Sequence, residues 1–272
     1  MNMHARPPQL LPEHAAFQTC EVRWVRHWNE HLFSFAIERP ASFRFRSGEF
    51  VMLGLEGEGG KPLMRAYSIA SPTWSDELEF LSIKVPDGPL TSRLQSIRQG
   101  DQLYLSRKPT GTLVSDALLP GKRLFMLSTG TGLAPFLSIA RDPDIYDAFS
   151  QVVIVHSTRR VSDLAYHDEL TAQLAGDPLV ADQALLQFHY IPTVTREPFR
   201  TSGRIGELIE NGWLFQPPVG GDRALNPETD RVMLCGSNEM IRDFAAMLER
   251  HGFDEGSNAK PGTFVLERAF VG

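Results

Sequence analysis

The chain contains little cysteine and has no long apolar run. Its 272 residues include only two cysteines, Cys20 and Cys235. Two thiols are too few for an iron–sulfur cluster or a structural zinc site held by four thiolates. No apolar stretch approaches the about 18–20 residues that a membrane-spanning helix needs. The N-terminal stretch 1–14 lacks the apolar core of a secretory signal, so we expect a cytoplasmic protein.

Basic residues are also few relative to acidic ones. The chain has 27 lysines and arginines against 33 aspartates and glutamates, a net charge of −6 that argues against general nucleic-acid binding. Only five of the basic residues are lysine. Arginine suits bidentate recognition of phosphate, but a GC-rich genome also enriches it. The positions of the arginines must therefore carry any functional argument.

The first half of the sequence has the pattern of an antiparallel barrel or sandwich. Short runs rich in aromatic and branched residues are separated by Gly, Pro and Asp clusters. These predicted strands are 21–28, 32–37, 49–55, 65–71, 77–85 and 102–106. One helix is predicted over 93–98, after the capping hydroxyls of Thr91 and Ser92 and before Gly100.

The pattern changes near residue 120 to apolar strands that alternate with helices. Such alternation predicts a parallel sheet with helices on both faces. The predicted strands include 124–128, 152–156, 188–193, 231–235 and 264–266, the predicted helices are 134–141, 162–174 and 239–251, and 205–210 continues the alternation. We therefore expect a loose arm at 1–17, a barrel at 18–121 and a doubly wound α/β domain at 122–272. A cleft between two such domains can hold two groups face to face.

A glycine-rich turn follows the first strand of the second half. The segment 128–136 reads Ser-Thr-Gly-Thr-Gly-Leu-Ala-Pro-Phe. Gly130 and Gly132 allow a tight turn and a close approach of phosphate to backbone N–H groups at a helix start. Pro135 stands where the dinucleotide fingerprint has its third glycine. A tight turn without a ligand is the alternative.

Arginines follow the next strands of the second half. Residues 152–160 end in Thr158, Arg159 and Arg160, without the carboxylate that would bind the ribose 2′-hydroxyl of NAD. Arg196 and Arg204 follow the next strand. Each arginine alone is most simply a solvated surface charge, but their recurrence at strand ends favours a 2′-phosphate site and hence NADP.

The barrel half carries a second pair of motifs. Residues 65–71 read Arg-Ala-Tyr-Ser-Ile-Ala-Ser, which places an aromatic ring between an arginine and a serine on a predicted strand. A glycine-containing loop at 83–92 leads into the predicted helix and suggests a phosphate site. Edge packing of an exposed tyrosine is the alternative.

Four motifs in this order resemble the ferredoxin–NADP⁺ reductase family over about residues 20–272. They are R-x-Y-S at 65–68, the glycine loop before Thr91 and Ser92, G-T-G-x-A-P at 130–135, and Cys-Gly-Ser at 235–237. The first motif, with the ending Ala-Phe-Val-Gly at 269–272, is similar to the bacterial ferredoxin/flavodoxin–NADP⁺ reductases. The resemblance implies FAD in an antiparallel β-barrel, NADP(H) in the α/β domain, and hydride transfer to flavin N5 with ferredoxin or flavodoxin as the one-electron carrier.

The resemblance also implies residue roles. Tyr67 would stack on the flavin ring and Arg65 would meet the pyrophosphate. The implied catalytic residues are Ser68 near flavin N5, Cys235 against the nicotinamide, and Glu267 in proton and hydride handling. The further FAD contacts implied are Ala66, Ile83, Lys84, Val85, Leu90, Thr91, Ser92, Thr131, Ala269 and Phe270. The NADP contacts implied are Gly130, Gly132, Thr158, Arg159, Thr195, Arg196, Arg204, Ser237, Asn238 and Asp243.

Partners and alternatives complete these expectations. We expect no resident metal, no nucleic-acid or membrane partner, and a monomer. An acidic carrier would dock on basic residues near the flavin edge, namely Arg44, Arg46, Lys61, Arg65 and Arg93. Ala269 stands where plastid-type members have an aromatic cover, so residues 270–272 are expected to restrain nicotinamide access. A ferric, flavin or oxygenase-associated reductase of the same fold, or a non-catalytic NADPH sensor, are the alternative functions.

Overall fold

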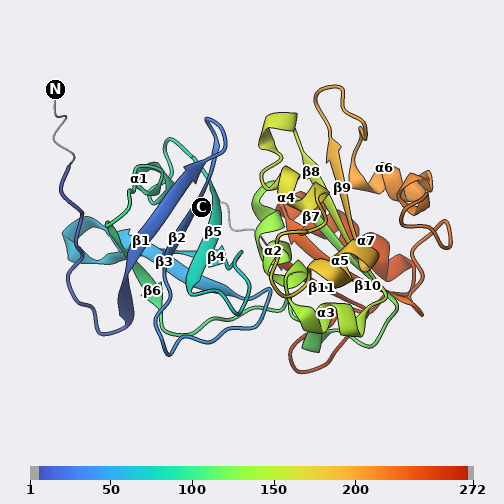
Figure 1. The fold of residues 1–272 in the computed structure, drawn as a ribbon, viewed down its shortest axis with the longest axis horizontal. Coiled ribbons are helices and arrows are strands. Elements are labelled where there is room, and N and C mark those ends of the chain that lie inside the picture. The colour runs from blue at the N-terminus through green and yellow to red at the C-terminus, as the bar shows by residue number, and fades with distance from the viewer. Residues whose placement is uncertain (1–5, 269–272) are drawn as a thin grey trace.

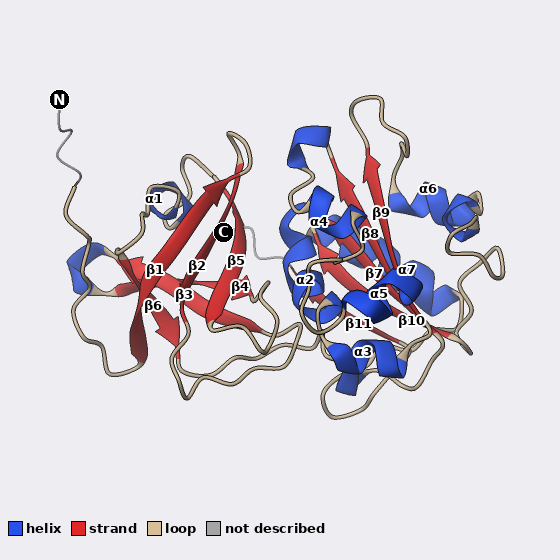
Figure 2. Ribbon diagram, viewed as in Figure 1, coloured by secondary structure: helices blue, strands red, loops and turns tan. Residues whose placement is uncertain are grey.

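A computed structural model of the chain describes residues 6–268 and shows two lobes side by side. One lobe is built almost entirely of strands and the other is a sheet covered by helices (Figures 1 and 2). The strands form one six-stranded antiparallel sheet and one five-stranded parallel sheet. Within 6–268, no helix has the length and apolarity needed to cross a membrane. The predicted order of antiparallel barrel and doubly wound α/β sheet is confirmed.

The first lobe follows the predicted strands closely. Its strand order is β4-β3-β6-β1-β2-β5. The strands are β1 (Phe17–His27), β2 (Leu32–Glu38), β3 (Phe50–Glu56), β4 (Pro62–Ser68), β5 (Glu77–Ile83) and β6 (Gln102–Ser106). Phe33, Phe35 and Phe80 are fully buried and pack inside this sheet. A helix was expected over 93–98, but α1 (Thr91–Leu94) is one turn that begins and ends earlier.

The N-terminal segment lies along the first lobe. The Arg6 guanidinium pairs with the buried Asp101 carboxylate at 2.7 Å, and the backbone N–H of Gln9 donates to the same carboxylate at 2.7 Å. The Tyr104 hydroxyl donates to the Pro12 carbonyl at 2.9 Å. These contacts come from residues 6–14, which belong to the segment 1–17 that was expected to be a loose arm.

The second lobe has the strand order β11-β10-β7-β8-β9, all parallel. Its strands are β7 (Arg123–Thr129), β8 (Gln151–Thr158), β9 (Phe188–Val194), β10 (Asp230–Gly236) and β11 (Phe264–Arg268). Its α-helices are α2 (Ala134–Ala140), α3 (Pro143–Ala148), α4 (His167–Thr171), α5 (Ala181–Gln187), α6 (Ile205–Glu210) and α7 (Asn238–Arg250). The 3₁₀ turns of the chain are η1 (Glu58–Gly60), η2 (Ser115–Ala117), η3 (Gly130–Leu133), η4 (Val161–Asp163) and η5 (Trp213–Phe215).

Alternate residues of β7 pack on opposite faces of the parallel sheet. Leu124 and Met126 join the cluster that holds α2 to α5, whereas Phe125 and Leu127 join the cluster that holds α6 and α7. Every residue from Leu124 to Leu127 is fully buried. Burial on both faces explains why the strands read as continuous apolar runs.

The helical expectation over 162–174 is wrong. Helix α4 covers only five of those residues, and η4 forms a separate turn before it. Tyr166 takes a left-handed backbone conformation with φ of 58°, which interrupts the helix between the two. The short helices α3 and α5 were not predicted.

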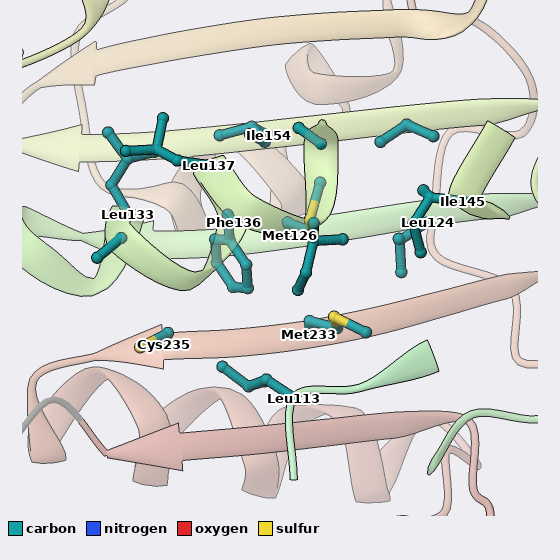
Figure 3. Close-up of a cluster of buried hydrophobic side chains, with 14 of the residues drawn as sticks. Leu113, Leu124, Met126, Leu133, Phe136, Leu137, Ile145, Ile154, Met233 and Cys235 are labelled. Atoms are coloured by element: carbon teal, nitrogen blue, oxygen red, sulfur yellow. The ribbon is translucent and has the colours of Figure 1, made fainter. Parts of the chain in front are cut away.

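One hydrophobic cluster joins the two lobes. Leu32 and Leu81 of the barrel belong to the same buried cluster as Leu133 and Phe136 of the second lobe. Figure 3 shows part of this cluster, with the Phe136 ring between β7 and β10 and Cys235 at the carboxyl end of β10. The two lobes are therefore packed against each other through apolar side chains.

Candidate functional site between the two lobes

The strand order of the parallel sheet reverses between β7 and β10. The chain passes from β7 outward to β8 and β9, then returns to place β10 and β11 on the other side of β7. Open parallel sheets bind ligands outside the carboxyl ends of the strands at such a switch point. The Ser237 backbone N–H donates to Thr129 Oγ1 at 3.1 Å, which ties together the loops that leave the two strands.

The glycine turn after β7 needs glycine for two different reasons. Gly130 has a φ of +53°, a conformation that L side chains rarely adopt, and the space around it is open to 4 Å. At Gly132, a Cβ atom would lie 2.2 Å from the carbonyl oxygen of Cys235. The first glycine therefore bends the turn, and the second lets it pack against the end of β10.

A buried histidine supports the turn from below. His156, at 1% exposure, lies 3.0 Å through Nε2 from the Gly130 carbonyl oxygen and 3.2 Å through Nδ1 from the Tyr190 hydroxyl. Since a carbonyl oxygen only accepts, Nε2 carries the proton and Nδ1 accepts from the tyrosine. Burial lowers the pKa of His156 to about 4, so the ring is neutral at neutral pH.

A pocket that is partly open to solvent lies between the lobes at this switch point. Both lobes supply its walls. Its predicted lining residues are Arg65, Ala66, Tyr67, Ser68, Ile83, Val85, Leu90, Thr91, Thr131, Cys235 and Glu267. Residues that the sequence analysis missed also line it: Phe50, Leu81, Ser82, Pro89 and Ala134.

The missed residues are neighbours of the predicted ones in the fold. Phe50 pairs with Ser68 across β3 and β4. Leu81 and Ser82 precede Ile83 on β5. The strand pairing therefore contains the signal that could have found them, but the sequence alone does not show which strands are neighbours.

On the barrel side, Tyr67 forms the aromatic wall of the pocket. Its hydroxyl lies 3.3 Å from Ser82 Oγ, and its ring stands edge-on to Phe35 and Phe80. Burial raises the pKa of Tyr67, so the phenol stays neutral. Arg65 lies two residues away on β4 and donates to the Met64 carbonyl at 2.9 Å. An oriented aromatic ring thus lies beside a permanent cation.

The other wall combines a thiol and a carboxylate. Burial raises the pKa of the Cys235 thiol, and the Glu267 carboxylate raises it further, so Cys235 stays protonated. A neutral buried thiol offers a small apolar contact rather than a nucleophile. Glu267 Oε2 accepts from the backbone N–H and the hydroxyl of Thr112, each at 3.3 Å. This contact connects β11 with the segment that leaves the barrel.

Two predicted FAD contacts lie outside the lining of this pocket. The Lys84 ammonium donates to the Asn29 carbonyl at 2.8 Å. The Ser92 carbonyl accepts from Gln95 Nε2 at 3.0 Å. The predicted contacts Ala269 and Phe270 lie outside the described residues 6–268.

A second pocket lies at the edge of the sheet where β8 and β9 end. Its walls are Arg159, Thr195, Arg196, Gly203, Arg204, Glu207 and Glu239. The Arg196 backbone N–H donates to the Arg159 carbonyl at 3.0 Å, which joins the two loops. The Glu207 carboxylate accepts from the Arg204 backbone N–H at 3.0 Å and so holds the start of α6. The structure thus brings Arg159 together with Arg196 and Arg204, which follow it by more than 35 residues in the sequence.

The other predicted NADP contacts lie outside the lining of this second pocket. Thr158 Oγ1 donates to the Arg160 carbonyl at 2.9 Å, and the Ser237 hydroxyl caps α7 by accepting from Met240 at 3.3 Å. Asp243 pairs with its neighbour Arg242 at 3.3 Å on the exposed side of α7. The predicted Asn238 is exposed at the first position of that helix. Three residues of the lining were not predicted, namely Gly203, Glu207 and Glu239, and each lies within three residues of a predicted contact.

The shared pocket fits FAD by the chemistry of its walls. A flavin is a flat aromatic ring attached to two phosphates, and Tyr67 and Arg65 offer an aromatic face and a guanidinium. The described residues 6–268 contain no cluster of three or more His, Cys, Asp or Glu that could hold a metal ion.

Comparisons with known proteins agree with this geometry. The model of the oxidoreductase FAD-binding domain matches residues 23–114, and that of the oxidoreductase NAD-binding domain matches residues 126–246. The flavodoxin/ferredoxin–NADP reductase of Rhodobacter capsulatus is 52% identical over 98% of this chain and 96% of its own length. The ferredoxin–NADP reductase of Pseudomonas aeruginosa is 52% identical over 93% of this chain and 97% of its own.

A solved structure extends the likeness to three dimensions. The ferredoxin–NADP⁺ reductase of Neisseria gonorrhoeae, with bound FAD and NADP, superposes with a TM-score of 0.85 at 34% identity. The match covers 94% of this chain and all of that one. The fold, the lining of the pocket and the similarity to these reductases agree. The chain belongs to the family of ferredoxin/flavodoxin–NADP reductases.

Proposed function

We propose that this protein is an FAD-dependent oxidoreductase that passes electrons between NADPH and a ferredoxin or flavodoxin. The observation that carries the proposal is the shared pocket, because Tyr67 and Arg65 from the barrel face Thr131, Cys235 and Glu267 from the nucleotide domain across one cavity. FAD bound there accepts a hydride and gives up single electrons. In this proposal the FAD-binding domain ends and the NADP-binding domain begins near residue 121.

The chain's own residues bind and orient the two ligands. Tyr67 would stack on the flavin ring, and Arg65 and Thr91 would hold its phosphates. Thr131 would lie where the flavin and nicotinamide rings meet, because it lines the pocket from the glycine turn. Cys235 would contact the nicotinamide as a neutral thiol, and Ser68 would lie near the flavin atom that receives hydride. Orienting groups of this kind lower the barrier by holding the reacting atoms in contact.

The arginine pocket supports NADPH as the nucleotide. Three guanidinium groups suit a dianionic 2′-phosphate, whereas the Thr195 hydroxyl in the same lining donates to the Thr158 carbonyl at 3.1 Å. The predicted NADP contacts that lie outside this pocket (Thr158, Ser237, Asn238 and Asp243) remain proposals for the rest of the nucleotide.

We expect the carrier to dock on exposed cations of the barrel lobe. Arg44, Lys61 and Arg93 are exposed, and Arg65 reaches the pocket itself. Arg46 is also exposed but pairs with Glu49 at 3.0 Å and with Asp116 at 3.2 Å. We therefore expect Arg46 to contribute less to docking than Lys61. The monomeric state and the cytoplasmic location remain predictions from the sequence.

A carrier-reduction assay tests the proposal. Purified protein is given NADPH and either a low-potential ferredoxin, a flavodoxin or a ferric chelate. We expect a yellow protein that releases FAD on denaturation and reduces the protein carriers with much higher kcat/KM than the chelate. Release of FMN would contradict the cofactor assignment. Equal or better use of the chelate would favour a ferric reductase, and absence of turnover would favour a sensor.

A further inference from the structure

A hydrogen-bonded seam joins the two lobes on one side of the shared pocket. Asn29, after β1, donates through Nδ2 to the Ser162 carbonyl at 2.7 Å and to the Asp163 carboxylate at 3.0 Å. Arg26 of β1 pairs with Glu169 of α4 at 3.2 Å. These contacts are exposed or half-buried, so they stabilise the seam only weakly. The seam has a buried centre as well.

That centre is a hydrogen-bond chain with a defined direction. The Trp28 indole N–H donates to Ser34 Oγ at 2.8 Å, and Ser34 Oγ lies 2.5 Å from the Tyr166 hydroxyl. The Tyr166 hydroxyl donates to Glu79 Oε1 at 2.6 Å. Because an indole only donates and the Tyr166 hydroxyl gives its single hydrogen to Glu79, the serine hydroxyl must donate to the tyrosine.

Only one member of this hydrogen-bond chain comes from the nucleotide domain. Trp28, Ser34 and Glu79 belong to the barrel, whereas Tyr166 precedes α4 of the second lobe. Ser34 is fully buried and Tyr166 is 9% exposed. Removing the tyrosine hydroxyl would leave a buried serine and a carboxylate without this partner, and such groups are costly to leave unpaired.

The backbone of Tyr166 is strained at the point where this contact forms. Its φ of 58° lies in the left-handed region that favours glycine, and it interrupts the helix predicted over 162–174. Its ring packs on Trp28 with centroids 4.7 Å apart. Backbone strain of this kind persists only where surrounding contacts hold it. The tertiary contact across the seam therefore outweighs the local helical preference.

The seam is directly connected to the wall of the shared pocket. Ser34 pairs with Leu81 across β2 and β5, and Glu79 lies two residues before Leu81 on β5. Leu81, Ser82 and Ile83 line the pocket. A movement of Tyr166 away from Glu79 would thus shift the nucleotide domain relative to the strand that forms one side of the cavity.

We propose that Tyr166 is a positioning residue for hydride transfer, because its hydroxyl clamps the nucleotide domain onto Ser34 and Glu79 of the barrel and so sets the geometry of the shared pocket. The inference rests on the proposed function, since it concerns how NADPH and FAD meet. It assigns no chemical step to Tyr166, which lies outside the pocket lining. Misplacement of reacting groups by about 1 Å costs on the order of 100-fold in rate.

Tyr166→Phe tests the clamp, with Tyr146→Phe as the matched control. Tyr146 is also a buried tyrosine of the nucleotide domain, and its hydroxyl donates to the Ala140 carbonyl at 2.6 Å within the same lobe. We expect Tyr166→Phe to slow flavin reduction by saturating NADPH by roughly 10- to 100-fold. The affinity for NADP⁺ should stay within about twofold, because the arginine pocket is untouched. Tyr146→Phe should leave both quantities near wild type.

A second readout does not depend on activity. In the purified proteins without nucleotide, amide hydrogen exchange over 24–34 and 161–171 should be at least about fivefold faster in Tyr166→Phe than in Tyr146→Phe. Faster exchange on both sides of the seam would show that the lobes part there. The proposal requires both effects, and it is overturned if either the reduction rate or the exchange of Tyr166→Phe equals that of the control.

A double variant tests whether the hydroxyls of Ser34 and Tyr166 act through the same hydrogen-bond chain. If they do, Ser34→Ala combined with Tyr166→Phe slows reduction no more than the slower single variant, whereas independent roles would give multiplied losses and overturn the proposal. If NADPH does not reduce the wild-type protein at all, the proposed function fails. The exchange comparison still decides in that case whether Tyr166 holds the lobes together.

Discussion

Replacing His156 with glutamine would remove a titrating group from beneath the glycine turn while keeping its hydrogen-bond pattern. His156 donates through Nε2 to the Gly130 carbonyl and accepts through Nδ1 from the Tyr190 hydroxyl. A glutamine amide can donate to the first group and accept from the second. The variant therefore separates the charge of the imidazolium from the positioning of the turn.

The magnitude follows from the pKa of His156. Burial lowers this pKa from 6.5 to about 4 in the folded protein. The unfolded chain therefore binds more protons below pH 6.5, and the stability present above pH 6.5 is lost as the pH falls towards 4. The full loss from a shift of this size is about 3 kcal/mol, of which ~2 kcal/mol is reached at pH 5.

Urea unfolding at pH 7.5, 6 and 5 measures this loss. Wild type and His156→Gln both lose stability through other groups, so the difference between them is the quantity of interest. We expect the variant to lose ~2 kcal/mol less than wild type between pH 7.5 and 5. Parallel curves for wild type and His156→Gln would refute the assignment of a buried neutral imidazole.

Three further predictions concern the two pockets and the core. Tyr67→Ala should weaken FAD retention by about 1–3 kcal/mol, by analogy with base–aromatic stacking, and equilibrium dialysis of the flavin measures it; unchanged retention would exclude stacking. Arg159→Ala should lower kcat/KM for NADPH by roughly 10- to 100-fold and leave NADH turnover unchanged, whereas equal losses would make the arginine structural. Arg123→Met should lower the free energy of unfolding by about 3–5 kcal/mol, because it leaves the fully buried Asp230 without its guanidinium partner at 2.7 Å; a small change in urea midpoint would contradict this.

The elements that sequence reasoning predicted best are those whose burial is simplest. β7 and β10 lie buried on both faces, so their apolar runs mark them directly. The glycine turn at Gly130 and Gly132 was informative for another reason. Close approach and positive φ restrict which residues fit, and the restriction shows in the local sequence.

The expectations that failed depend on contacts between distant segments. The amphipathic pattern of 162–174 predicts one helix, but Tyr166 turns away to reach Ser34 and Glu79 of the other lobe. Periodicity contains no information about that partner. The same limit explains why Phe50 was missed, since its place in the pocket depends on which strands pair.

Anaerobic stopped-flow mixing of the purified protein with NADPH tests the central claim most directly. Rapid bleaching of the visible flavin absorbance requires that both lobes contribute to one pocket, because the nicotinamide and the flavin must meet there. We predict rapid bleaching with NADPH, much slower bleaching with NADH, and recovery of the absorbance when oxidised ferredoxin or flavodoxin is added. A protein that binds FAD but is not bleached by NADPH would contradict the account.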